Sequence, residues 1–124
     1  MKWLLVFLGS GLGGCLRLFT SEFAARNFGL NYPFGTFLSN LVACLFLGLI
    51  LGWFESTRLL DERFRWFLAA GICGGYSTFS TFSNETLQLF LNQKYTEAML
   101  YVLVSIAAGL AAVAGGYALV QALK

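Results

Sequence analysis

The feature that most constrains this chain is the length of its apolar runs. Four runs of helix length, at about residues 3–25, 34–54, 66–92 and 98–123, are separated only by short polar connectors. About 20 apolar residues in a helix cross the hydrocarbon layer of a membrane, where the backbone must satisfy its hydrogen bonds internally. The sequence therefore predicts an all-α membrane protein, with residues 1–124 forming one four-helix transmembrane subunit in contact with the lipid bilayer.

Composition excludes several other classes of protein. Hydrophobic residues make up 58% of the chain and charged residues 11%, which leaves too little polar material to surround a soluble core. The net charge is only +2 and the basic residues are scattered, so nucleic acid is not an expected partner. Histidine is absent, and no candidate nucleophile lies beside a base. We therefore expect no enzyme activity.

The cysteines, and the glycines of the first run, are interpreted as structural residues. Cys15, Cys44 and Cys73 lie singly in different apolar runs without metal-ligand spacing, so they predict neither a disulfide nor a metal site. The first run also contains a G-x-G-x-x-G pattern, but no strand precedes it, which argues against a dinucleotide site. Gly9 and Gly13, four residues apart, instead predict a face for close helix packing.

The third run, unlike the others, contains a polar segment at Gly71–Glu85. Three glycines open this segment, and five Ser and Thr residues then surround Phe79 and Phe82. Because glycine is a poor helix former, the pair Gly74 and Gly75 predicts a helix break. A break at membrane depth is tolerated where protein, water or an ion satisfies the freed backbone, so this segment predicts an ion or substrate site.

Side chains in and beside the break suit a small anion. Phe79 and Phe82 share one helix face, and the positive edges of their rings form soft anion contacts, although such a pair also serves simple packing. A row of hydroxyls and one acid follow in the same segment: Ser80, Thr81, Ser83 and Glu85. Hydroxyl donors can replace the water of a small ion, whereas bare carbonyls at the break can hold a cation.

Polar residues in the other spans are costly enough to require an explanation. Arg17 in the first span either extends to the membrane interface or attracts anions at a vestibule. Asn40 shares a helix face with Thr36, and its amide either joins two helices or donates to a passing anion. In the last span, Tyr101 and Ser105 share one face, whereas small residues on another face predict packing: Ala107, Ala111 and Gly115.

The distribution of basic residues indicates an orientation. Four spans place both termini and the central loop on one side, together with five basic residues: Lys2, Arg58, Arg63, Arg65 and Lys124. The opposite side has Arg26 and Lys94. This bias favours cytoplasmic termini. No internal repeat is visible, so inverted symmetry would require a second copy of the chain.

Three segments together resemble one known family. The third-span run from Gly74 to Ser83, Gly35-Thr36 followed by Asn40, and Gly13-Gly14 followed by Arg17 are similar to the Fluc (CrcB) family of fluoride channels, in order over essentially the whole chain. The resemblance implies four-helix subunits assembled as an antiparallel, dual-topology homodimer with two pores. It also implies passive export of fluoride from the cytoplasm across the inner membrane of a bacterium.

The resemblance further implies roles for individual residues. Phe79, Phe82 and Asn40 match the pore residues of the family, and Arg17 matches its vestibule arginine. The polar track would contain Ser80, Thr81 and Ser83, with Glu85 at its end, and the last helix would contribute Tyr101 and Ser105. A structural Na⁺ at the dimer centre would be held by the backbone carbonyls of Gly74 and Ser77.

Two other functions remain as alternatives. A small dimeric proton-coupled drug exporter has a similar length and helix count, but it would need Glu85 or Glu22 as its ionisable acid. A non-transporting packing subunit would also use the glycine and alanine faces.

Overall fold

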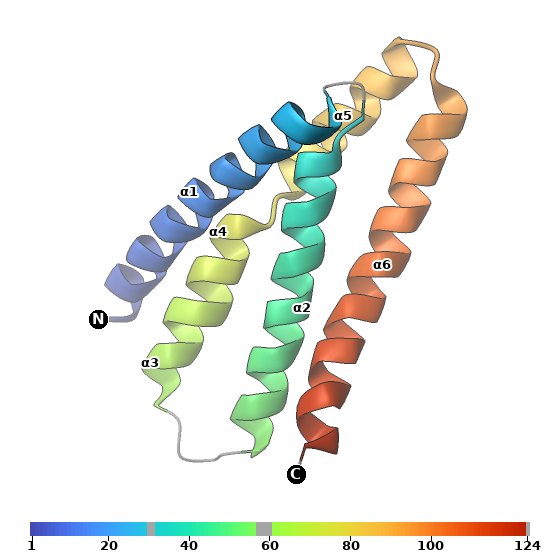
Figure 1. Cartoon of the computed structure of the whole chain (residues 1–124). Helices are drawn as coiled ribbons and strands as arrows, with labels where there is room; N and C mark the ends of the chain where they lie inside the picture. Colours follow the sequence, from blue (N-terminus) through green and yellow to red (C-terminus); the bar gives the residue numbers. More distant parts are fainter. Residues whose placement is uncertain (30–31, 57–60, 124) are drawn as a thin grey trace.

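The protein is described by a computed structural model that covers residues 1–29, 32–56 and 61–123 (Figure 1). Three long helices are α1 (Lys2–Phe28), α2 (Phe34–Ser56) and α6 (Tyr95–Ala122). Between α2 and α6 lie four consecutive pieces: α3 (Glu62–Arg65), the π-helical η1 (Trp66–Cys73), α4 (Gly74–Tyr76) and α5 (Phe79–Leu91). The described residues contain no strand, which confirms the prediction of an all-α chain.

Three of these helices, α1, α2 and α6, are long and apolar enough to cross a membrane. The third apolar run is instead divided, with its first half in α3, η1 and α4 and its second half in α5. Local signals set several ends. The left-handed φ of 80° at Gly29 follows the end of α1, and the Asp61 side chain caps α3 by accepting from the Arg63 N–H at 3.0 Å.

The predicted break exists, but its predicted position was wrong. Gly74 and Gly75 are helical, whereas Ser77 (φ −77°, ψ 157°) and Thr78 (φ −152°, ψ 119°) are extended. Gly75 serves close packing instead, because a Cβ atom there would lie only 2.5 Å from the carbonyl oxygen of Ser10. A Gly-Gly pair permits a break without requiring one, and here the chain departs from the helix two residues later.

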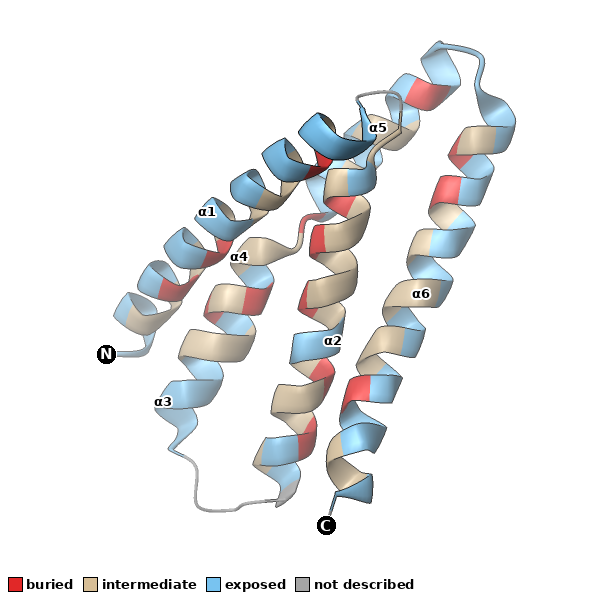
Figure 2. Ribbon diagram, in the orientation of Figure 1, coloured by how far each residue is buried: buried red, intermediate tan, exposed pale blue. Residues whose placement is uncertain are grey.

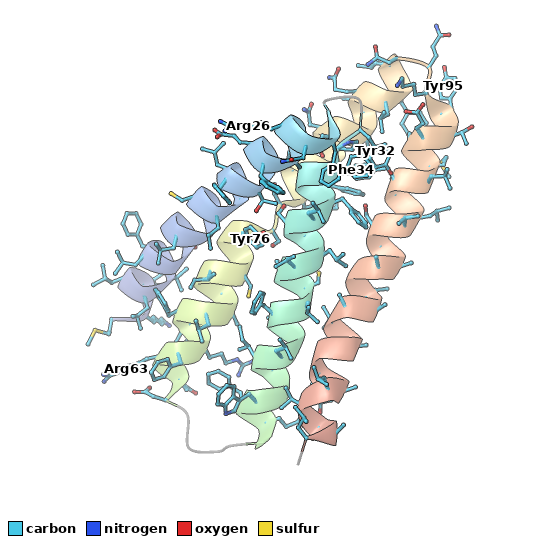
Figure 3. The ribbon with its side chains drawn as sticks, in the orientation of Figure 1. Arg26, Tyr32, Phe34, Arg63, Tyr76 and Tyr95 are labelled. Atoms are coloured by element: carbon cyan, nitrogen blue, oxygen red, sulfur yellow. The ribbon has the colours of Figure 1, made fainter. Side chains whose placement is uncertain are left out.

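The ends of the helices place the two termini on the same side of the molecule, as four spans require, while the cytoplasmic orientation stays a prediction. Both termini lie toward the lower part of Figure 1, whereas α1 and α5 end at the upper part, where α2 and α6 begin. Figure 3 correspondingly shows Arg26 and Arg63 at opposite ends of the molecule. Arg58 and Lys124, which contribute to the predicted bias, lie outside the described residues.

Glycines bring α1 against the first half of the third span, as Gly9 and Gly13 predicted. A Cβ atom on Gly9 would lie 2.9 Å from the Cα of Gly71, and one on Gly13 would lie 2.7 Å from the backbone nitrogen of Tyr76. Figure 2 shows the buried residues of α1 on its side facing α4. The two backbones are therefore in contact, which is the usual role of small residues between membrane helices.

The other tight contact joins α2 to α6. A Cβ atom on Gly116 would lie 2.5 Å from the carbonyl oxygen of Leu45, so this glycine supplies the close approach on α6. In the single chain Gly116 makes this contact, whereas the small residues predicted as packing positions are exposed: Ala107, Ala111 and Gly115. Equivalent small residues occur on several faces of this helix, and only the position of α2 decides which face is used.

Candidate functional site

The break in the third span is held open by Asn40 of α2. Its Oδ1 accepts a 2.7 Å hydrogen bond from the Thr78 backbone N–H, and its Nδ2 donates to the Thr78 carbonyl at 3.3 Å. One amide side chain thus satisfies both backbone groups of Thr78, which a continuous helix would satisfy internally. Asn40 therefore joins two spans, which is one of its two predicted roles. One of its two amide N–H groups makes the bond to the Thr78 carbonyl.

Thr78 starts the next helix. Its Oγ1 accepts from the Thr81 backbone N–H at 3.2 Å and donates to Thr81 Oγ1 at 3.0 Å, so it is the N-cap of α5. Ser80 Oγ lies 3.3 Å from the same hydroxyl. The start of α5 is therefore set by a side-chain cap immediately after the backbone that Asn40 holds.

Carbonyl groups before the break lose their helical donors, and for Gly74 and Ser77 the new partners of those donors are known. The donor for the Gly74 carbonyl in a continuous helix would be the N–H of Thr78, which Asn40 binds instead. The donor for the Ser77 carbonyl would be the N–H of Thr81, which bonds to Thr78 Oγ1. By contrast, the Cys73 carbonyl keeps its bond to the Ser77 N–H at 3.0 Å. Gly74 and Ser77 thus present oxygen atoms that suit a hard cation.

An open cavity of about 390 Å³ adjoins the break. Its polar and aromatic lining consists of Asn40, Ser77, Thr78, Phe79, Phe82 and Ser105. The remainder is apolar and comes from Cys44 and the α6 residues Ile106, Gly109, Leu110 and Val113. None of the described side chains in this lining carries a formal charge at neutral pH. The cavity therefore offers neutral hydrogen-bond donors and aromatic rings within an apolar wall.

Phe79, Phe82 and Ser105 meet at this cavity although they come from two helices. The rings of Phe79 and Phe82 have centroids 5.9 Å apart and planes tilted by 39°. The Ser105 Oγ is buried and has no hydrogen-bond partner among the residues that the structure describes. Because a buried hydroxyl without a partner is costly, this atom is suited to a water molecule or ion in the cavity.

Glu85 lies in a second cluster, between α2 and α6. Its Oε1 accepts from Thr36 Oγ1 at 2.7 Å, and its Oε2 accepts from the Tyr101 hydroxyl at 2.8 Å. It also borders a cavity of about 200 Å³ beside the end of α1. The carboxylate is thus held by one hydroxyl on each oxygen, in contact with a space large enough for water.

Aromatic rings connect the two clusters. The Phe82 ring lies 5.1 Å from the ring of Tyr101, which meets Tyr32 edge to face at 5.7 Å. Burial raises the pKa of Tyr32, and the Glu97 carboxylate adds to the increase, so this phenol outside the spans stays neutral at physiological pH. Packed aromatic rings therefore extend from the cavity at the break to the Glu85 cluster.

The other predicted residues are less closely grouped. Ser80, Thr81 and Ser83 are exposed on α5, together with Phe79, of which 79% of the surface is accessible. Arg17 is half-buried on α1 and is not among the side chains that line the cavity at the break. Within one chain, the fold therefore brings together the cavity residues and the Glu85 cluster, but it does not bring Arg17 to them.

Removing one donor to Glu85 is expected to weaken the fold only modestly. Thr36→Val and Tyr101→Phe should each lower the free energy of unfolding by about 1 kcal/mol, because water in the adjoining cavity can replace the lost hydroxyl. The measurement is the thermal midpoint of the purified protein. Thr86→Val is the matched control, since Thr86 bonds only within its own helix, to the Phe82 carbonyl at 2.8 Å. Losses equal to that control would contradict a structural role for the cluster.

Sequence reasoning missed two features of the site. Thr78 was interpreted as one of several hydroxyls in the polar segment. A Thr directly before the start of a helix is, however, an N-cap signal. The contact between Thr20 and Tyr76 was also not predicted, because their hydrogen bond at 2.8 Å joins residues 56 positions apart. No local pattern marks a contact of that separation.

Comparison with known proteins finds similarity along nearly the whole chain. The profile of the family described as "CrcB-like protein, Camphor Resistance (CrcB)" matches residues 4–117. A protein of Methylobacterium sp. (strain 4-46), named fluoride-specific ion channel FluC, is 43% identical over 121 residues, covering 98% of this chain and 97% of that protein. A protein of the same name from Flavobacterium psychrophilum is 38% identical over 86% of this chain and 86% of its own length. Another, from Clostridium perfringens, is 38% identical over 97% of this chain and 94% of its own length.

These relatives are named as ion channels rather than enzymes, and their similarity extends over nearly the full chain. The apolar helices are those of a multi-pass membrane protein. With a family profile that matches 4–117 and relatives well above 30% identity, the chain belongs to the CrcB family.

Proposed function

We propose that this chain is the subunit of a fluoride-selective channel that lets fluoride leave the bacterial cytoplasm passively. The observation that carries the proposal is the uncharged cavity at the break, where the Asn40 amide, the unpartnered Ser105 hydroxyl and two phenylalanine rings meet. The names of the relatives agree with this substrate. An anion channel needs donors that replace water without binding the ion too tightly, and neutral donors meet that need.

The path that we propose follows the two clusters. Arg17 raises the local fluoride concentration at a vestibule, and Asn40 and Ser105 donate hydrogen bonds along the cavity. Phe79 and Phe82 line the narrow part with their positive ring edges. Ser80, Thr81 and Ser83 continue the track toward Glu85, whose carboxylate is held by Tyr101 and Thr36.

We further propose that the functional unit is an antiparallel homodimer with two pores. The support is the outer face of α5, where an exposed phenylalanine lies among exposed polar residues: Phe79, Ser80, Thr81, Ser83 and Asn84. Polar side chains facing lipid are unfavourable, so a second copy is the cover that suits this face. In detergent, the protein should have the mass of two chains, and the mass of one chain would contradict the dimer.

A structural Na⁺ at the dimer centre fits the residues present. The carbonyls of Gly74 and Ser77, whose helical donors are engaged elsewhere, would supply oxygen ligands, and each copy would contribute the same pair. When bound, such an ion would neutralise the negative ends of these carbonyl dipoles. The chain itself supplies the geometry, because Asn40 and Thr78 keep the two donors away from the carbonyl oxygens.

Reconstitution tests the function directly. Liposomes containing the purified protein and loaded with potassium fluoride should release fluoride once a potassium ionophore lets K⁺ balance the charge, measured with a fluoride electrode, whereas chloride release should be at least about tenfold slower. A larger halide accepts weaker hydrogen bonds from the neutral donors of the cavity. Equal release of the two halides would contradict the proposal, as would efflux that requires a pH gradient.

Phe82→Ala distinguishes a channel from a packing subunit in the same assay. Removing the ring that links the cavity to Tyr101 should slow fluoride release by about tenfold or more. Phe90→Ala is the matched control, because Phe90 lies on the same helix and packs against Tyr95, at a centroid distance of 5.9 Å. Unchanged release in the Phe82 variant would favour a non-transporting role.

A further inference from the structure

We infer that Tyr76 and Thr20 form a positioning pair that fixes where the first half of the third span ends, and thereby where the Gly74 and Ser77 carbonyls lie. The Tyr76 hydroxyl and Thr20 Oγ1 are 2.8 Å apart and join α4 to α1. This inference rests on the proposed cation site at the break, since it concerns what holds the carbonyls of that site.

The direction of the hydrogen bond follows from its neighbours. Thr20 Oγ1 donates to the Leu16 carbonyl at 2.9 Å, which uses its single proton. Tyr76 must therefore be the donor, and Thr20 the acceptor, in the bond between them. The threonine is thus held by its own helix and presents a lone pair to the phenol from a fixed place.

The surroundings of Tyr76 separate it from the ion path. Tyr76 borders an apolar cavity of about 400 Å³ whose walls come from α1, α2 and η1, including Leu16, Phe46 and Cys73. The cavity at the break has a different lining that does not include Tyr76. Figure 3 shows Tyr76 between α1 and α2. Its hydroxyl is therefore placed to hold the helix end rather than to meet a passing ion.

Tyr76 is the last residue of α4, directly before the extended backbone of Ser77. A side-chain bond to Thr20 holds this last turn against α1, in addition to the backbone approaches at Gly13 and Gly75. A Cβ atom added to either glycine would lie within 2.7 Å of the facing backbone. The joint between η1 and α4 has helical backbone angles, so α4 continues the helix of η1, and these contacts fix the end of one longer helix.

The far side of the break is held by a different helix. Asn40 of α2 binds the backbone of Thr78, whereas Thr20 of α1 binds the side chain of Tyr76. Only Ser77 lies between the two anchored residues. The separation of the two half-helices therefore depends on both anchors, and loss of the Tyr76 bond releases one of them.

Amide hydrogen exchange on the full chain in lipid nanodiscs tests this pair. The Ser77 N–H, which bonds to the Cys73 carbonyl, should exchange about tenfold faster in Tyr76→Phe and in Thr20→Val than in the original protein. The double variant should be no faster than either single variant, because both remove the same bond. Thr20→Ser keeps the acceptor and should restore slow exchange. Tyr95→Phe, which removes an exposed hydroxyl on α6, should change nothing.

A second measurement concerns the cation. Na⁺ should raise the thermal midpoint of the original protein relative to N-methyl-D-glucamine. In Tyr76→Phe, the Na⁺ concentration needed for the same increase should be about threefold higher or more. Unchanged exchange at Ser77 in Tyr76→Phe, or additive effects in the double variant, would overturn the positioning pair. A midpoint in the original protein that ignores Na⁺ would instead contradict the cation site, and the exchange measurement would still decide the role of Tyr76.

Discussion

Replacing Asn40 with aspartate is expected to stop fluoride efflux while leaving the helices in place. The variant keeps an oxygen that accepts the Thr78 N–H, so the break can still form. It loses the N–H groups of the amide and places a negative charge beside a cavity whose lining is otherwise uncharged. The change therefore alters the electrostatics of the path much more than its shape.

The size of this effect follows from charge repulsion. Two unit charges about 4 Å apart at an effective dielectric constant of about 20 repel by roughly 4 kcal/mol. Each 1.36 kcal/mol or so corresponds to a factor of about ten, so fluoride release should fall by about a thousandfold. The measurement is the initial rate of fluoride release from liposomes, with circular dichroism to confirm that the helices are intact.

Asn92→Asp is the matched control for that experiment. Asn92 follows α5, is exposed, and its side-chain amide donates to the Gln88 carbonyl of its own helix at 2.8 Å. The same chemical change at this position should leave fluoride release close to its original rate. If Asn40→Asp conducts as fast as this control, the cavity at the break is not the path of the ion.

Replacing Gly13 with alanine should prevent α1 from packing against the third span. An added Cβ atom would lie 2.7 Å from the Tyr76 nitrogen, and it would also meet the Ile72 carbonyl oxygen. Both neighbours are backbone atoms of a helix, so no flexible side chain can move aside. We therefore expect a loss at the upper end of the usual cost of overpacking, about 3 kcal/mol or more in the free energy of unfolding.

Gly14→Ala is the control, because it makes the same substitution one residue later. Among the described residues, a Cβ atom added to Gly14 meets no atom within 4 Å apart from those of its own stretch of helix. Alanine favours a helix over glycine by about 1 kcal/mol, so this variant should be as stable as the original protein or more stable. The comparison uses the thermal midpoint and the yield of folded protein after purification. Equal midpoints for the two variants would show that α1 does not pack through Gly13.

The extent of the spans could be read from the sequence because it depends on local properties. Apolar length, the scarcity of charge and the polar insertion after Gly71 predicted an all-α membrane chain with an interrupted third segment. Gly9 and Gly13 likewise predicted the packing face of α1, since small residues four apart can only meet a neighbour on one side.

The position of the break was not a local property. Gly74 and Gly75 have the weakest helix propensity in the segment, yet they are helical, and the chain opens at Ser77 and Thr78. The deciding contact is the amide of Asn40, which lies on another helix and takes both backbone groups of Thr78. Helix propensity limits which backbone conformations a segment can adopt. Here a hydrogen-bond partner from α2 decides which of these conformations forms.

The sequence by itself thus determined that this chain lies in a membrane, which of its spans is interrupted, and which family it resembles. Only the tertiary structure decided where that span opens, that Thr36 and Tyr101 hold Glu85, and that Tyr76 is tied to Thr20. The physical reason is that burial in lipid is a property of each segment, whereas these hydrogen bonds join side chains far apart in the chain. Such pairs form only after the helices have packed.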